Sequence, residues 1–421
     1  MADDILLRVL TLNCWGIPYV SKNWIARLQA IIDKLTTDEY DIVCLQEIWS
    51  SKDFEIVQAK VKDHLPHAHY FYSGVYGSGM CILSRYPIQD VMFHKWALNG
   101  YVHKIHHGDW FGGKGVGLCK IMIRDIVANV YTAHLHAEYD KENDEYTAHR
   151  VLQAFDTAQF IRMTKGGADV IILGGDLNTE PQDLAYRIIC GTAGMVDACS
   201  ISSNIQGTNM CANNSYTNSK CARKEPQGKR IDYILYLGST HYNVEVTDFK
   251  HPFPERIPSK PFSYSDHEAV MAHFKLTRGE REVAMSDVKD TLKEALDICD
   301  LALRDVKRQR CYYLLIGGLL AIPVIWSMGI DCFTQSIGLS IGANILRLLL
   351  TATLCYVLFM SSIWNSVERN ALTAGSLAMT IHLEQLKNNS SNNIPEHRAL
   401  SKSDVTLHGR ETLQRRVAPR S

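Results

Sequence analysis

Two long uncharged apolar stretches near the C-terminal end constrain this chain more than any other feature. The first covers nineteen residues, 312–330, enough to cross the hydrocarbon core of a bilayer as a helix. The second, 336–364, carries one charge, Arg347. Its best spanning part is 345–364, which places that arginine at one end, where the side chain reaches the headgroups. The sequence therefore predicts a two-span transmembrane hairpin at 311–366. The alternative is a pair of buried helices in a second soluble domain.

The segments on either side of the hairpin predict its orientation. Within 278–310, apolar residues recur every three to four positions among many charges, which predicts an amphipathic juxtamembrane helix. That helix can pack on the preceding domain, pair with a second copy or lie on a bilayer surface. The tail 367–421 is expected to be helical and then disordered. Basic residues flank the hairpin at 307–310 and in this tail, so both termini are predicted to lie in the cytosol.

The first part of the chain, 1–277, has the pattern of a layered α/β domain. Apolar strand-like segments alternate with amphipathic helices at 24–35 and 147–163, which is typical of helices packed over sheet faces. The predicted strands are 7–13, 41–47, 80–84, 117–123, 127–134, 170–174, 231–237 and 269–274. The segment 194–227, rich in Asn, Ser, Gly and Cys, predicts a long loop.

Charge and cysteine content narrow the class of protein. The formal net charge is −1, with 44 Lys and Arg against 45 Asp and Glu, so the chain lacks the basic field typical of nucleic-acid-binding proteins. Nucleic acid is therefore not an expected partner. The twelve cysteines include no CxxC pair, which argues against a zinc knuckle or a thioredoxin-type site. The N-terminal residues MADDILLRVL do not resemble a signal peptide, and the domain at 1–277 is expected to face the reducing cytosol.

Polar side chains stand at or next to the ends of four predicted strands. The segments are TLNCW at 11–15, LQEIW at 45–49 and GGDLN at 174–178, with SDHEA at 265–269 just before the strand predicted at 269–274. Because open α/β folds bind ligands at strand ends, we expect these segments to share one site. Glu47 follows an apolar strand and needs a partner there. A hard cation with oxygen ligands supplies one, which favours Mg²⁺, with Mn²⁺ as the alternative.

The other strand-end residues suggest acid–base chemistry. Asp176 and Asn178, two positions apart on a turn, can direct a carboxylate and an amide into one space. His267 is a candidate general base, and Asp232 on a neighbouring strand is the carboxylate that would hold its tautomer. The alternative for Asp232 is a structural pair with Arg230.

Several further positions give weaker signals. His134, at the end of a strand, is a candidate phosphate ligand or general acid, whereas His136 is expected behind the site or exposed. Asn13 has the alternative of a turn or cap residue. The sequence GGKG at 112–115 resembles a phosphate cradle without the ending of a P-loop. Lys114 is accordingly a candidate phosphate contact. His103, His106 and His107 are expected in solvent.

The motifs TLN, LQE, TAHL, GDLN, RIDY and SDH, in that order, resemble the endonuclease/exonuclease/phosphatase superfamily over about residues 5–275. The resemblance implies a DNase I-like, four-layered α/β sandwich and Mg²⁺-dependent cleavage of phosphate esters. Within that superfamily, WGIPYVSK, DWFGGKGVG, TAHLHAEY, PFSYSDHEA and the hairpin are similar to short neutral sphingomyelinases with two C-terminal spans. One departure is an extra alanine before His134, where many members read T-H.

The resemblance also implies roles for individual residues. Glu47 becomes the principal metal ligand, supported by Asn13, with Asp266 beside the metal or the base. His267 becomes the base, paired with Asp232.

The remaining implied roles concern the phosphate and the proton. Asp176 and Asn178 orient water and phosphate, and His134 binds phosphate or protonates the leaving oxygen. Apart from the resemblance, Asn13, Lys114 and His136 are the expected phosphate and substrate contacts. The general base stays open between Asp176 and His267.

The reaction implied is phospholipase C-type hydrolysis of sphingomyelin to ceramide and phosphocholine. The alternatives are lysophospholipids or other choline phospholipids, or a membrane-tethered nuclease or phosphatase. The expected protein is an integral multi-pass protein of the endoplasmic reticulum, nuclear envelope or plasma membrane. The lipid bilayer is an expected partner, and a homodimer through the juxtamembrane and transmembrane helices is a further expectation.

Overall fold

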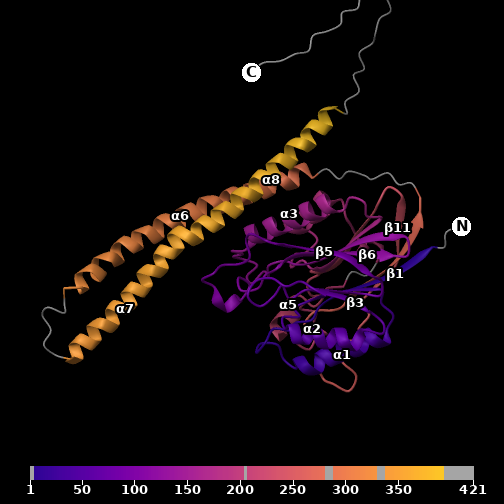
Figure 1. The fold of residues 1–421 in the computed structure, drawn as a ribbon, viewed down its shortest axis with the longest axis horizontal. Coiled ribbons are helices and arrows are strands. Elements are labelled where there is room, and N and C mark those ends of the chain that lie inside the picture. Colours follow the sequence, from indigo (N-terminus) through magenta and orange to yellow (C-terminus); the bar gives the residue numbers. More distant parts are fainter. Residues whose placement is uncertain (1–3, 203–205, 280–287, 330–336, 393–421) are drawn as a thin grey trace, which may run out of the picture.

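The computed structural model describes residues 4–202, 206–279, 288–329 and 337–392 (Figure 1). Two six-stranded mixed sheets pack face to face, and helices cover their outer faces. One apolar cluster lies between the sheets, and one lies under each helical layer. The predicted DNase I-like sandwich of four layers is confirmed.

In the first sheet, two parallel strands lie at the centre and antiparallel strands extend it on both sides. The order is β11 (Tyr242–Lys250), β12 (Val270–Arg278), β1 (Ile5–Asn13), β2 (Ile42–Gln46), β4 (Cys81–Ser84) and β3 (His67–Tyr70). Helices α1 (Trp24–Thr37) and α2 (Ser51–Val61) cover its outer face, where Leu28, Ile31 and Val57 are buried.

The second sheet has the same plan. Its order is β5 (Ile88–Lys95), β6 (Gly115–Ile123), β7 (Ile126–His134), β8 (Val170–Asp176), β10 (Asp232–Gly238) and β9 (Val196–Asp197). Strands β7 and β8 are parallel. Helices α3 (Thr147–Thr164) and α4 (Leu184–Ala193) cover the outer face. Each sheet therefore has a central parallel pair whose C-terminal ends point to the same edge of the sandwich.

All eight predicted strands are present, and four others, β3, β5, β9 and β11, were not predicted. Strand β5, at a sheet edge, exposes much of both faces, so its sequence lacks a clear apolar alternation. Strands β3 and β9 are short. Strand β11 does alternate buried and exposed residues, and that signal was overlooked. The described part of 194–227 is mostly irregular, with η2 (Ala198–Ile201) and α5 (Ser219–Lys224) within it.

The predicted hairpin is built from longer helices than the sequence suggested. Helix α6 (Lys289–Ser327) joins the juxtamembrane segment and the first span into one helix of 39 residues. Helix α7 (Ile337–Phe359) continues through a π-helical turn, η4 (Met360–Trp364), into α8 (Asn365–Asn392). By length and composition alone, both arms are able to cross a membrane. Residues 330–336, between the two arms, and the tail at 393–421, predicted to be disordered, lie outside the described residues.

The hairpin packs on the sandwich through α6 and α8 (Figure 1). Leu292, Ala295 and Cys299 of α6 are buried in the apolar cluster under α3 and α4, together with Leu372 and Met379 of α8. Of the three placements that the sequence left open for the amphipathic segment, the structure shows packing on the preceding domain. The homodimer stays a prediction.

Arg347 lies at the far end of the hairpin. Its Nη2 donates to the carbonyl oxygen of Ser327 at 2.7 Å. A cation at the C-terminal end of α6 complements the partial negative charge of that helix end.

Candidate active site

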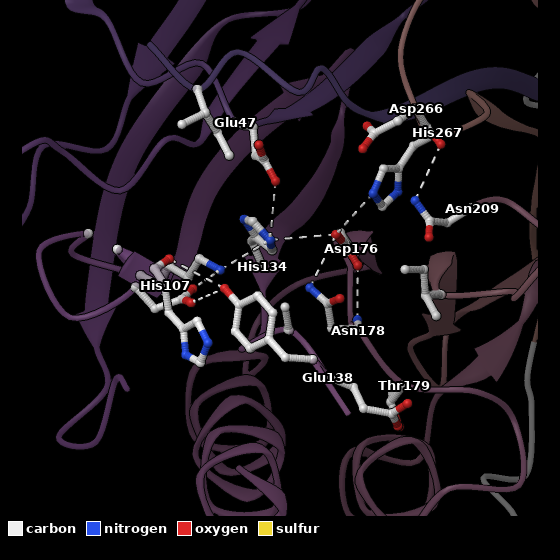
Figure 2. Close-up of a pocket in the computed structure, with 18 of the residues that line it drawn as sticks. Glu47, His107, His134, Glu138, Asp176, Asn178, Thr179, Asn209, Asp266 and His267 are labelled. Atoms are coloured by element: carbon white, nitrogen blue, oxygen red, sulfur yellow. Dashed lines mark hydrogen bonds and ion pairs between the residues drawn. The ribbon is translucent and has the colours of Figure 1, made fainter. Parts of the chain in front are cut away.

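The predicted strand-end residues converge on one cavity of about 580 Å³ at the edge of the sandwich. Asn13, His134 and Asp176 end strands β1, β7 and β8, and Glu47 directly follows β2. Asp232 begins the antiparallel strand β10, which brings it to the same edge. Figure 2 shows Glu47, His134, Asp176 and His267 facing one another across this cavity.

Asn13 links the two sheets by bridging two carboxylates. Its Nδ2 donates to Glu47 Oε1 at 3.0 Å and to Asp176 Oδ2 at 2.9 Å. Its Oδ1 accepts from the backbone N–H of Trp15 at 3.0 Å. The side chain is fully buried and does not line the cavity. This geometry favours a role in which Asn13 orients both carboxylates. It does not favour the predicted role of Asn13 as a metal ligand or substrate contact.

Glu47 has the features expected of a metal ligand. It adopts a left-handed backbone conformation, with φ of 59°, which turns its side chain off the end of β2 and into the cavity. Its Oε2 is buried and has no hydrogen-bond partner among the described residues. Burial and the nearby charge of Asp266 raise the pKa of Glu47. A divalent cation would satisfy this oxygen and stabilise the carboxylate, so the residues present fit a hard metal ion with oxygen ligands.

His267 and Asp232 form a hydrogen-bonded pair. His267 Nδ1 lies 2.8 Å from Asp232 Oδ2, and its Nε2 lies 3.9 Å from Asp176 Oδ2. Burial, which by itself would lower the pKa of His267, is outweighed by Asp232 and Asp176, which raise it. Burial and Asp232 likewise raise the pKa of Asp176. The alternative partner of Asp232, Arg230, is instead paired with Asp197 at 2.6 Å.

Asp176, Asp232 and His267 form a second arrangement that could hold a metal, because one ligand atom of each lies within 4.8 Å of the others. Glu47 is the better candidate for a metal ligand. A metal between Asp232 and His267 would have to open their 2.8 Å hydrogen bond. Hard cations also prefer a site made of oxygens.

His134 and Asn178 complete the centre of the site. His134 Nε2 lies 3.5 Å from Asp176 Oδ2 and 3.9 Å from Glu47 Oε1. Burial and the charge of Lys114 lower the pKa of His134, which favours the neutral ring. Asn178 has a φ of 44°, a conformation that asparagine tolerates. Its Nδ2 donates to the carbonyl of Leu135 at 3.0 Å.

Lys114 lines the cavity as predicted, and Asp109, which the sequence analysis did not single out, pairs with it. The Lys114 Nζ to Asp109 Oδ1 distance is 2.7 Å, and both residues are buried. Tyr139 donates its hydroxyl to Asp109 at 2.6 Å. Burial raises the pKa of Asp109, but Lys114 and His136 together hold it well below its usual value. The spacing in DWFGGK, with an acid five residues before the lysine, was the available signal.

His136 lies behind the cavity, and His107 lines it. His136 is fully buried, 3.4 Å from Asp109, and stacked on Tyr146 with ring centroids 3.8 Å apart. It does not line the cavity, so a direct substrate contact is not supported by its position. His107, expected in solvent, lines the cavity and bonds the hydroxyl of Tyr146 at 2.6 Å.

Comparisons with known proteins identify the family of this chain. The Endonuclease/Exonuclease/phosphatase family model matches residues 10–267. The "Putative neutral sphingomyelinase" of Drosophila melanogaster is 40% identical over 432 residues, covering 90% of this chain and 97% of the relative. The "Sphingomyelin phosphodiesterase 2" of Homo sapiens is 41% identical over 273 residues, 64% of each chain. A sphingomyelinase C from Streptomyces griseocarneus aligns over 64% of this chain and 99% of its own, with 18% identity and a TM-score of 0.48. The chain belongs to the endonuclease/exonuclease/phosphatase family and is a homologue of the neutral sphingomyelinases.

Proposed function

We propose that this chain is a membrane-bound, metal-dependent phosphodiesterase that hydrolyses sphingomyelin to ceramide and phosphocholine. The observation that carries the proposal is the 40% identity to a putative neutral sphingomyelinase along nearly its whole length. The buried, unpartnered Glu47 oxygen beside Asp176 and His267 supports it. Glu47 would hold the cation, with Asp266 next to it, and we infer Mg²⁺, with Mn²⁺ as the alternative.

The cation would polarise a phosphoryl oxygen and neutralise charge that grows in the transition state. The protein's own residues supply the rest of the chemistry. Asp232 holds His267 Nδ1, which leaves Nε2 free to face Asp176 and an attacking water. His267 Nε2 and Asp176 Oδ2 face each other at 3.9 Å, which leaves room for a water close to both groups. Either group can then accept the proton of the water that attacks phosphorus.

On the other side of the cavity, Lys114 and His134 are placed to contact the phosphate. Asp109 holds the Lys114 ammonium at 2.7 Å, and Lys114 Nζ lies 3.3 Å from His134 Nε2. Lys114 would compensate negative charge on the phosphate oxygens. His134 would bind the phosphate or donate a proton to the leaving alkoxide. Positioning and charge stabilisation of this kind are general to phosphoryl transfer.

The test is hydrolysis of sphingomyelin vesicles by the purified full chain. We expect release of phosphocholine with Mg²⁺ and none with EDTA. Equal or faster turnover of lysophospholipids would assign the substrate to that alternative. Cleavage of DNA without lipid hydrolysis would overturn the proposal.

We also propose that the hairpin crosses the membrane twice and leaves both ends and the catalytic domain in the cytosol. The membrane we infer is the endoplasmic reticulum with the nuclear envelope, or the plasma membrane. The sequon at Asn213 is exposed on the catalytic domain and should remain unglycosylated in cells. Glycosylation at Asn213 would contradict the proposed orientation, because it would mean that the catalytic domain does not face the cytosol.

A further inference from the structure

Exposed apolar side chains surround the mouth of the cavity. Six of them, 37% or more exposed, make up what we call the apolar rim: Ile17, Tyr19, Val20, Val75, Tyr76 and Ile105. Three members, Ile17, Tyr19 and Tyr76, line the cavity itself. The other three, Val20, Val75 and Ile105, each lie within two residues of a residue that lines the cavity. An exposed apolar patch at a site entrance points to a lipid or protein that covers it.

The rim comes from three connections between strands and helices, and contacts fix each of them. Residues 14–23 follow β1, 71–80 join β3 to β4, and 96–114 join β5 to β6. The N–H of Val75 donates to the carbonyl of Phe111 at 3.1 Å. A Cβ on Gly113 would lie 2.3 Å from the backbone nitrogen of Gly74, so only glycine permits this close approach.

The first connection is held from beneath by the buried Arg27. Its guanidinium donates to the carbonyl oxygens of Cys14 and Trp15, both at 2.7 Å. The rim therefore presents apolar side chains from a fixed backbone. Ordering these loops at a partner surface would cost little conformational entropy.

A ring contact joins the connection that carries Ile105 to the hairpin. Trp110, in the same connection as Ile105, lies against Trp364, with ring centroids 6.4 Å apart. Trp364 is the last residue of the predicted second span, and tryptophan is enriched where spans leave the membrane. The hairpin of α6 and α7 passes the catalytic domain and extends beyond it in Figure 1. A bilayer that contains the hairpin would therefore have its surface near Trp110.

We propose that the apolar rim dips into the surface of the bilayer that the hairpin crosses, so that the cavity opens directly onto the lipid leaflet. This inference rests on the proposed function, because it supplies that site with a bilayer lipid. The headgroup can then enter the cavity while the hydrocarbon chains remain among apolar side chains and lipid. The contact with Trp364 favours a bilayer over a protein partner, and a protein on the rim would also close the cavity mouth.

The test uses rim residues that do not line the cavity. The variant Val20→Ser/Val75→Ser/Ile105→Ser removes three side chains that are 63 to 69% exposed. In the full chain reconstituted in vesicles, we expect about ten-fold slower hydrolysis of bilayer sphingomyelin, because shallow insertion depends on buried apolar area. Hydrolysis of a short-chain sphingomyelin dissolved as monomer should change less than about two-fold, because exposed substitutions rarely disturb a folded site.

A matched control removes apolar side chains that are 54 to 74% exposed elsewhere on the domain, Leu6→Ser/Met92→Ser/Met163→Ser. It should leave both activities unchanged. Equal loss of both activities in the rim variant would overturn the inference, because that result would indicate damage to the site. Unchanged bilayer activity in the rim variant would also overturn it.

A second measurement does not depend on activity. A photoreactive benzophenone side chain at position 75 should crosslink to vesicle lipid, and the same group at position 163 should not. Crosslinking at 75 without sphingomyelin hydrolysis by the unmodified chain would support the rim and overturn the proposed function. Hydrolysis without lipid crosslinking at 75, or crosslinking to a protein instead, would overturn the proposal that the rim enters the bilayer surface.

Discussion

The catalytic sandwich and the hairpin differ in the kind of side chain that they bury and expose. At the edge of the sandwich, Asn13, Asp176 and Asp232 are polar or charged and almost completely buried. Along the hairpin, Leu315 and Leu348 are apolar and 62% and 69% exposed. Burying polar or charged groups and exposing large apolar side chains both cost free energy for a protein alone in water. The comparison teaches that each region is shaped for a partner from outside the chain, a cation for the first and a lipid bilayer for the second.

The sharpest test of the first half of this comparison is Glu47→Gln. The change keeps the shape of the side chain and removes the charge that would hold the cation. We expect sphingomyelin hydrolysis to fall by about 10³-fold, since a metal supplies several kcal/mol of transition-state stabilisation. Calorimetric titration should show the loss of tight Mg²⁺ binding. The control is Glu39→Gln at an exposed carboxylate paired with Arg8. Normal Mg²⁺ binding in Glu47→Gln would contradict the assignment.

A somewhat smaller effect is expected from Asp232→Asn, which weakens the hold on His267 Nδ1. Acid–base catalysis typically contributes about 10²–10⁴-fold, so kcat should fall within that range while KM changes little. Asp232 raises the pKa of His267, so its loss should lower that pKa. The pH–rate profile should move to lower pH wherever the loss of a proton from His267 limits the rate. A profile that moves to higher pH would argue against this pairing.

The docking of the hairpin on the sandwich can be broken at Gly375. A Cβ there would lie 2.1 Å from Leu152 Cδ2 of α3, so Gly375→Val should crowd the Leu152 side chain and weaken the packing of α8 on α3. Overpacking of this kind costs about 1–3 kcal/mol. Thermal unfolding in detergent should show the loss. The matched control is Gly318→Val, where a new Cβ would meet no described atom within 4 Å. Equal stability of the two variants would contradict the docking.

The smallest effect is expected on the lipid-facing surface of the hairpin. Leu348→Ala should change stability in a bilayer by less than about 0.5 kcal/mol, because lipid tails are as apolar as leucine. In the sandwich, Leu173 is fully buried, and Leu173→Ala should cost about 2–5 kcal/mol. Chemical denaturation in vesicles measures both. A large loss for Leu348→Ala would mean that this face packs on protein, and it would then be the place to seek the predicted homodimer.

Much of the fold could be read from the sequence because the two burial patterns are local. Strands with buried faces, such as β2 and β8, appear as continuous apolar runs. The hairpin appears as long runs without charge. Of the four strands that were missed, β11 does alternate buried and exposed residues and was overlooked, whereas β3, β5 and β9 are exposed or short. Pairing with neighbours, which no local pattern records, defines them as strands.

The residues that form the site could be predicted from the sequence, whereas the contacts between them could be predicted less well. The strand-end rule brought Glu47 and Asp176 together correctly, because the C-terminal ends of parallel strands meet at one edge of a sheet. His267 reaches the same edge because it precedes β12, which runs antiparallel to β1. The rule did not reveal that Asn13 bridges two carboxylates across 34 and 163 residues of sequence. It also did not find Asp109, whose importance depends on Lys114 and Tyr139 lying against it.

The sequence by itself therefore determined the α/β sandwich, the apolar hairpin and the set of polar residues at strand ends, because each depends on the order of neighbouring residues. Only the tertiary structure decided which polar atoms are paired, which Glu47 oxygen has no partner among the described residues, and that the hairpin packs against α3 and contacts Trp110. Those features depend on distances between residues far apart in the chain. Burial and hydrogen bonding act on such distances, and sequence spacing does not record them.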